Sequence, residues 1–169
     1  MFEQGSLVIY GIHGVCKVTN LETRTINGKK VEYYILKPLE QADASFLVPT
    51  QNPAAVSKLR PIMTEQELEV LFLRDIPGDD AWIVDENQRK QRYRELITGG
   101  DIAALICMVR AIHYHKEVQA AAGKKLHQCD EYFLRDAERL VSSELSLILH
   151  IDPSAVGQYI KEKINTNRG

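Results

Sequence analysis

The chain has 169 residues, a formal net charge of −2, 44% hydrophobic residues and 26% charged residues. This composition is typical of a soluble globular protein and excludes a disordered chain. No apolar run reaches the ~18 residues of a membrane span, and the overall charge excludes strong global attraction to nucleic acid.

Three cysteines, Cys16, Cys107 and Cys129, are scattered along the sequence without clustered spacing. The N-terminal stretch MFEQGSLVIYG lacks the basic start and long apolar core of a signal peptide. A sparse, odd set of cysteines indicates reduced thiols rather than a disulfide framework. We therefore expect a cytoplasmic protein.

Charge is unevenly distributed. Residues 1–61 carry seven Lys/Arg and five Asp/Glu, whereas residues 62–169 carry fourteen and eighteen. Within the acidic part, residues 87–94 (NQRKQRYR) hold four basic residues and no acid. A local basic patch on an acidic background can still contact phosphate groups.

The first 50 residues are typical of β structure. Segments rich in β-branched and aromatic residues, bounded by Gly and Pro, predict four or five short strands: SLVIYG (6–11), GVCKVTNLE (14–22), VEYYILKP (31–38) and ASFLVP (44–49). Asn27-Gly28 predicts a type I′ hairpin turn, because both central positions of that turn need a positive φ. Gly11 and Gly14 predict a tight bend. So many short strands indicate a small barrel or a strongly bent sheet.

After Pro61 the apolar residues recur with helical period. Thr64 and Glu67 form a capping-box pattern for a helix over 64–74, Asp85 begins a helix that ends before Gly99-Gly100, and Asp101 begins the next. A long helix is predicted from Lys124 to His150, and Asp152-Pro153 opens a last short one. The fold class is therefore α+β, with a β-barrel domain over residues 1–60 and an all-α bundle over 61–169.

No constellation of catalytic residues is evident. The sequence contains no Walker loop, GxGxxG, HExxH or GxSxG motif. His113 and His115 lie two residues apart on a predicted helix, which places them on different faces and disfavours a shared metal. We expect no enzyme activity, no metal, no cofactor and no small-molecule substrate.

Two features remain as candidate binding sites. The hairpin around Asn27-Gly28 can present a free strand edge to another protein, or its charges Arg24, Lys29 and Lys30 can simply guard that edge against aggregation. On the helix after Asp85, the basic residues of 87–94 form either a phosphate-binding ridge or a solvated face. Trp82, the sole tryptophan, is either an exposed stacking wedge or a plug between loop and bundle.

The segments GSLVIYGIHGVCKVTNLETRTINGKKVEYYILK (5–37), FLVPTQN (46–52), KQRYRELITGGDI (90–102) and VRAI (109–112) together resemble the CarD/CdnL family of bacterial transcription regulators. The first module also resembles the RNA-polymerase-interacting domain of transcription-repair coupling factors. The resemblance implies a Tudor- or SH3-like barrel that pairs strand edges with the RNA polymerase β subunit. It further implies a helical domain that contacts promoter DNA at the upstream edge of the melted bubble and stabilises the open complex.

The residue patterns and this resemblance together give two sets of candidate site residues. The polymerase-binding set is Arg24, Thr25, Phe46, Leu47, Val48 and Pro49. The DNA-binding set is Trp82, Arg89, Lys90, Arg92 and Arg94. The alternative is a protein-interaction module whose helical part never contacts DNA, which the acidic second half favours.

The sequence departs from the family pattern at two positions. The family's second basic docking position falls on Leu47, and its DNA-wedging tryptophan falls on Arg89. The segment from there to Gly100 is also shorter by about one helical turn. Either Trp82 substitutes for the wedge by another route, or the chain lacks a wedge and holds DNA through its basic residues alone.

Overall fold

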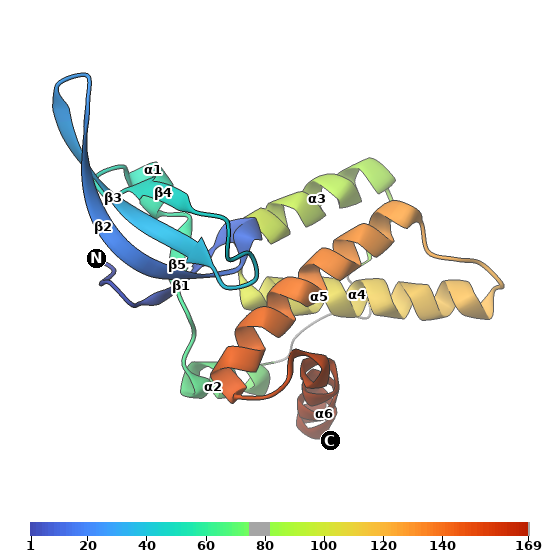
Figure 1. Ribbon diagram of the computed structural model, residues 1–169. Helices are drawn as coiled ribbons and strands as arrows, with labels where there is room; N and C mark the ends of the chain where they lie inside the picture. Colours follow the sequence, from blue (N-terminus) through green and yellow to red (C-terminus); the bar gives the residue numbers. More distant parts are fainter. Residues whose placement is uncertain (75–81, 169) are drawn as a thin grey trace. The chain divides into compact units, whose positions relative to one another are not determined.

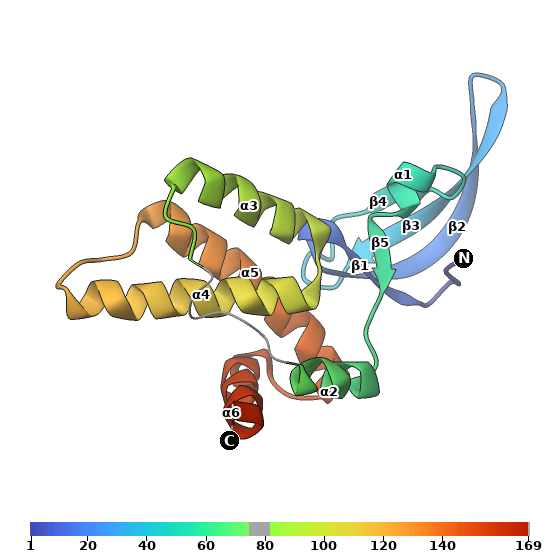
Figure 2. The same ribbon diagram turned by 180° about the vertical axis from the view of Figure 1, so that it is seen from behind.

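The computed structural model describes residues 1–74 and 82–168, and it divides the chain into two compact units. The sheet unit is Met1–Ile62 and the helical unit is Met63–Gly169. Five strands and a short helix form the first, and longer helices form the second (Figures 1 and 2). The predicted α+β class, with the β module first, is confirmed.

The sheet unit is one antiparallel sheet with strand order β4-β3-β2-β1-β5. Its elements are β1 (Leu7–Tyr10), the 3₁₀ turn η1 (Gly11–His13), β2 (Val15–Ile26), β3 (Lys29–Pro38), β4 (Phe46–Pro49), α1 (Pro53–Val56) and β5 (Leu59–Pro61). The described strands do not close into the expected hydrogen-bonded barrel, since β4 and β5 remain the two edges. Both edge strands are short and end in a proline, which has no N–H to donate to a further partner.

The hairpin between β2 and β3 has the turn that its sequence predicts. Asn27 and Gly28 both have positive φ, of 50° and 76°, as a type I′ turn requires. The two strands pair from Cys16 opposite Pro38 to Ile26 opposite Lys29. β1 pairs with β2 only along its beginning, Val15 to Lys17, so the far end of the hairpin extends as a two-stranded ribbon (Figure 1).

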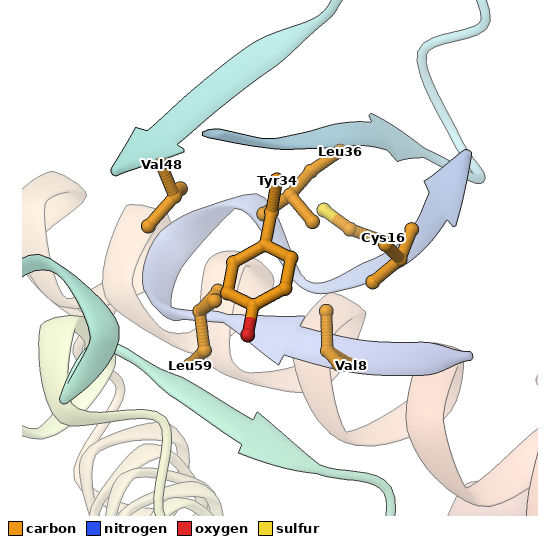
Figure 3. Close-up of a cluster of buried hydrophobic side chains, with 7 residues drawn as sticks. Val8, Cys16, Tyr34, Leu36, Val48 and Leu59 are labelled. Atoms are coloured by element: carbon orange, nitrogen blue, oxygen red, sulfur yellow. The ribbon is translucent and has the colours of Figure 1, made fainter. Parts of the chain in front are cut away.

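The core of the sheet unit lies on one face of this sheet. Alternate residues of the strands are buried there together: Val8, Cys16, Val18, Tyr34, Leu36, Val48 and Leu59 (Figure 3). The Tyr34 hydroxyl accepts a hydrogen bond from the backbone N–H of Phe2 at 3.2 Å, so its polar end is satisfied. Burial raises the pKa of the Cys16 thiol to about 11, which keeps it protonated and unreactive.

Side-chain caps set where the helices of the second unit begin. Its elements are α2 (Glu65–Leu73), α3 (Glu86–Gly99), α4 (Ile102–Ala121), α5 (Gln128–Leu149), η2 (Pro153–Ala155) and α6 (Val156–Arg168). Thr64 and Glu67 form the predicted capping box, and the carboxylates of Asp85 and Asp101 accept from backbone N–H groups at the starts of α3 and α4. Gly100 ends α3 in the left-handed conformation.

The core of the helical unit lies where α3, α4 and α5 pack together, while α6 packs on α5 and α2. Buried residues repeat every three or four positions on α3, α4 and α5, such as Ile102, Leu105 and Met108 on α4. The prediction for α5 was wrong at its start, because the helix begins at Gln128 and not at Lys124. Gly123 turns the chain after α4 with a φ of 73°. Leu126, which follows this turn, is buried, and α5 begins only beyond it.

Among the residues that the structure describes, no helix is long and apolar enough to cross a membrane. The three cysteines are free thiols, with Cys16 buried and the other two half-buried.

Candidate functional site

β4 is the edge strand that carries most of the first predicted site. It pairs with β3 alone, from Leu36 opposite Phe46 to Tyr33 opposite Pro49. Val48 is buried in the core, whereas the Leu47 side chain is 39% exposed on the opposite face. In this sheet, one side of the β4 backbone therefore has no neighbouring strand, and Leu47 lies beside it.

Phe46 fixes the beginning of β4 against η1. Its ring lies 4.1 Å from the His13 ring and 5.6 Å from the Tyr10 ring, measured between centroids. The contacts join the beginning of β4 to the end of β1 and to η1, more than thirty residues earlier in the sequence. Phe46 therefore helps to position the strand, and its ring is half-buried.

Residues directly opposite each other in an antiparallel sheet share a face. Five apolar side chains accordingly share the face opposite the core, and all are half-buried or exposed. We call them the outer-face patch: Val31, Tyr33, Ile35, Leu47 and Pro49.

Arg24 extends this patch onto the ribbon. It lies opposite Val31 on the same face, two strand spacings or about 10 Å from the line of β4. Its Nε donates to Glu22 Oε1 at 2.8 Å, and this hydrogen bond raises the pKa of Arg24. The Arg24 side chain is 47% exposed. Thr25, opposite Lys30, is exposed on the other face.

The predicted polymerase-binding residues thus separate into three groups. Leu47, Pro49 and Arg24 share the outer face, Phe46 and Val48 support β4 from within the unit, and Thr25 lies on the ribbon's other face.

The second predicted site is on α3, and the structure corrects one of its members. Arg89 is only 3% exposed, so the prediction that it lies on an open basic ridge was wrong. Its Nε and Nη2 donate to the two carboxylate oxygens of Asp130 on α5, at 2.8 and 2.9 Å, and Asp130 is fully buried. Its Nη1 donates to the backbone carbonyls of Ile83 and Val84, at 2.9 and 3.3 Å. No phosphate group can reach this guanidinium without breaking these bonds.

The helical period explains why Arg89 is inside. It precedes the buried Tyr93 by four residues and the buried Ile97 by eight, so all three occupy one face of α3. The hydrogen bonds to Asp130 raise the pKa of Arg89 despite its burial. Asp130 is the residue that the sequence analysis missed. Its only sequence signal is its position four residues before the buried Leu134.

Trp82 is half-buried and packed within the helical unit. Its ring stacks on the His115 ring of α4, with centroids 3.6 Å apart and planes within 6° of parallel. The Arg89 guanidinium carbon lies 4.3 Å from the Trp82 ring centroid. Of the two alternatives for Trp82, these contacts favour the plug over the exposed wedge.

Lys90, Arg92 and Arg94 make up the accessible part of the predicted basic site. Lys90 pairs with Glu86 one turn earlier, and Arg92 Nη1 lies 3.6 Å from Glu95 Oε2. Arg94 is exposed and close enough to Lys90 to oppose its positive charge, while the bond to Glu86 raises the pKa of Lys90 overall. The exposed surface of α3 thus carries three cations and two acids.

His113 and His115 point to different neighbours, as their spacing predicts. His113 Nε2 lies 2.6 Å from Glu138 Oε1 on α5, whereas His115 contacts Trp82. Over residues 1–74 and 82–168, no three His, Cys, Asp or Glu side chains gather in a way that could hold a metal ion.

A comparison with protein families identifies the sheet unit. Residues 2–63 match the model of the CarD-like/TRCF RID domain, where RID stands for RNA-polymerase-interacting domain. The match covers the whole open sheet, β4 and the ribbon included, and ends where the helical unit begins. The protein is therefore an RNA-polymerase-interacting, transcription-related protein, and its sheet unit belongs to the CarD-like/TRCF RID domain family.

Proposed function

We propose that the sheet unit binds the β subunit of bacterial RNA polymerase through β4 and the outer-face patch, while α3 contacts promoter DNA and so modulates open-complex stability. The observation that carries the proposal is the open β4 edge in a domain of a polymerase-interacting family.

Strand addition explains how such an edge binds. An extended segment of the partner pairs with the backbone of β4, so main-chain hydrogen bonds supply affinity. Its side chains on the outer face meet Leu47 and Pro49, and an acidic side chain of the partner meets Arg24. Because Arg24 already has Glu22 as a partner in an exposed pair, exchanging that carboxylate for another costs little.

The docking test compares Leu47→Glu with Leu7→Glu. Leu7 lies on β1 and is 37% exposed, nearly the same as Leu47, so the two substitutions impose similar costs on folding. We expect L47E to weaken binding to a purified β-subunit fragment at least about tenfold, equivalent to about 1.4 kcal/mol, and L7E to leave it unchanged. Equal affinity for both variants would remove β4 from the interface.

The DNA contact rests on Lys90, Arg92 and Arg94. Contact with up to three phosphates gives a slope of log affinity against log salt of about −3 at most, so binding to free DNA is weak. Attachment to polymerase supplies the effective concentration that this surface lacks.

The DNA test reverses Lys90 and Arg94 to Glu, with Lys116→Glu on α4 as the control. We expect the double reversal to shorten the promoter open-complex lifetime in the presence of polymerase and K116E to preserve it. Polymerase binding is measured on the same variants, so a docking defect is distinguished from a DNA defect.

A protein-interaction module without DNA contact is the second candidate. The ion pairs of Lys90 with Glu86 and of Arg92 with Glu95 favour it, because they reduce the net positive charge of α3. An unchanged open-complex lifetime in the Lys90/Arg94 reversal, with polymerase binding intact, would select this candidate.

A further inference from the structure

Four side chains from four segments form one continuous network in the helical unit. Trp82 precedes α3, Arg89 lies on α3, His115 on α4 and Asp130 on α5. Arg89 binds Asp130 through two hydrogen bonds and also contacts the Trp82 ring, whose surface stacks on His115. The network therefore holds the beginning of α3 and the residues just before it against the other two helices.

His115 is the member of this network that can change charge near neutral pH. The amide nitrogen Nε2 of Gln119 lies 3.1 Å from His115 Nε2. An amide nitrogen only donates hydrogen bonds, so this contact fits a neutral His115 whose Nε2 accepts it. The arrangement thus suits a neutral imidazole.

The charged groups around His115 come from each helix packed against it. Arg89 on α3 and His127, next to the start of α5, oppose a positive charge on His115, whereas Asp130 on α5 favours one. Both oxygens of Asp130 are already bound by Arg89, and the Arg89 cation is held close to the same indole ring. A second cation on that ring therefore gains little from the aromatic surface.

We propose that His115 is a proton-sensitive latch: neutral His115 holds Trp82 and the start of α3 in place, and protonated His115 releases them. The regulatory role of this latch rests on the proposed function of α3, since Lys90 and Arg94 lie on the helix that it holds.

The direction of the effect follows from the environment. Burial, and secondarily Arg89, lower the pKa of His115 below its ordinary value of 6.5. A lowered pKa means that the latched arrangement binds protons less well than the released one. The contribution of the latch to the free energy of unfolding is therefore complete above pH 6.5 and diminishes as the pH falls below that value.

The test uses Trp82 as its own reporter, because the chain has one tryptophan. Intrinsic fluorescence of the full chain is measured from pH 8 to pH 5, without DNA or polymerase. We expect a sigmoidal shift to longer emission wavelength with a midpoint below pH 6.5, at unchanged helix content by circular dichroism. An emission spectrum that stays constant over this range would overturn the proposal.

Two variants and a control test whether the fluorescence transition arises from His115. His115→Gln and His115→Phe should both lose the sigmoidal transition, and the phenylalanine retains an aromatic ring if the glutamine variant folds poorly. His113→Gln, two residues away and paired with Glu138, should keep it. A transition that persists in both His115 variants would refute the latch.

Failure of the latch and failure of the proposed function are distinguishable. The fluorescence titration involves no DNA, so its result bears on the latch alone. If the latch also acts on α3 at the promoter, the open-complex lifetime should differ between pH 8 and pH 6 more in the unaltered protein than in H115Q. An equal pH dependence in both would limit the latch to the isolated protein and overturn its regulatory role.

Discussion

The buried pair of Arg89 and Asp130 gives the sharpest prediction for stability. Asp130→Leu removes the acceptor of two charge-assisted hydrogen bonds of 2.8 and 2.9 Å and leaves a buried cation without its counterion. Each such bond contributes about 1.5–3 kcal/mol, and breaking a buried ion pair on one side costs about 3–5 kcal/mol. Nη1 keeps its bonds to the Ile83 and Val84 carbonyls, so we expect about 3 kcal/mol, the lower end of that range.

The double variant Arg89→Met/Asp130→Leu distinguishes the net contribution of the ion pair to stability from the cost of removing one partner alone. Both charges are then absent, and an apolar pair of similar volume is often as stable as an ion pair. The carbonyls of Ile83 and Val84 lose a donor, at about 1 kcal/mol each. We therefore expect the double variant to be more stable than Asp130→Leu alone, within about 2 kcal/mol of the unaltered protein.

Urea denaturation followed by Trp82 fluorescence measures both variants in the full chain, because the reporter lies inside the helical unit. The free energies of unfolding of Asp130→Leu, Arg89→Met and the double variant complete a mutant cycle. If Asp130→Leu costs less than about 1 kcal/mol, or if the two single costs simply add, the pair is not the desolvated, coupled one that the structure describes.

Three further features are tested by single substitutions. The Tyr93 hydroxyl is buried and has no hydrogen-bond partner among the described residues, so Tyr93→Phe should be neutral or stabilise by up to about 1–2 kcal/mol in urea denaturation; a clear loss would reveal a partner. Gly28→Ala should destabilise the hairpin by about 1 kcal/mol because φ is +76° there, whereas Gly99→Ala, with equal space and no positive φ, should be neutral or stabilising by thermal denaturation. Thr64→Ala should cost about 1 kcal/mol by removing the cap of α2, as a denaturation curve at pH 7 would show. The hydrogen bonds that Thr64 donates to the Glu67 carboxylate lower the pKa of Glu67. The stabilisation from these bonds alone is present above the ordinary pKa of 4.5 and is lost as the pH falls through the lowered pKa.

Local chemistry accounts for what the sequence predicts well. Caps need only a side chain and the backbone two or three residues on, so Thr64, Asp85 and Asp101 mark the beginnings of their helices reliably. The hairpin is equally local, because Asn27 and Gly28 adopt positive φ regardless of what surrounds the ribbon.

Features that depend on distant partners were harder to predict. The sequence pattern predicts no element between the last strand and the helix that begins at Thr64. The structure has α1 and β5 there, and β5 is only three residues long and pairs with β1. Whether the sheet closes into a barrel depends likewise on whether its two edge strands pair with each other, which the sequence of no single strand determines.

The sequence interpretation of Arg89 was wrong because it rested on charge alone. Four basic residues in 87–94 suggested one ridge, but helical period divides them between two faces. Arginine is buried readily only where a carboxylate meets its planar group, and the one that does so is 41 residues away on α5. No residue near Arg89 in the sequence indicates that Asp130 is its partner. The helical spacing of Arg89 from Tyr93 and Ile97 does indicate that Arg89 faces the core.

This burial has a consequence for the proposed promoter contact. The family resemblance places an aromatic wedge at the position of Arg89, and here that position holds a cation enclosed by Asp130, Ile83 and Val84. Trp82, the sole tryptophan, is packed on His115 and Arg89. A wedge works by unstacking bases, whereas phosphate contacts act mainly through charge. In the proposed function, the effect on open promoters therefore comes from Lys90, Arg92 and Arg94 and should weaken steeply as salt concentration rises.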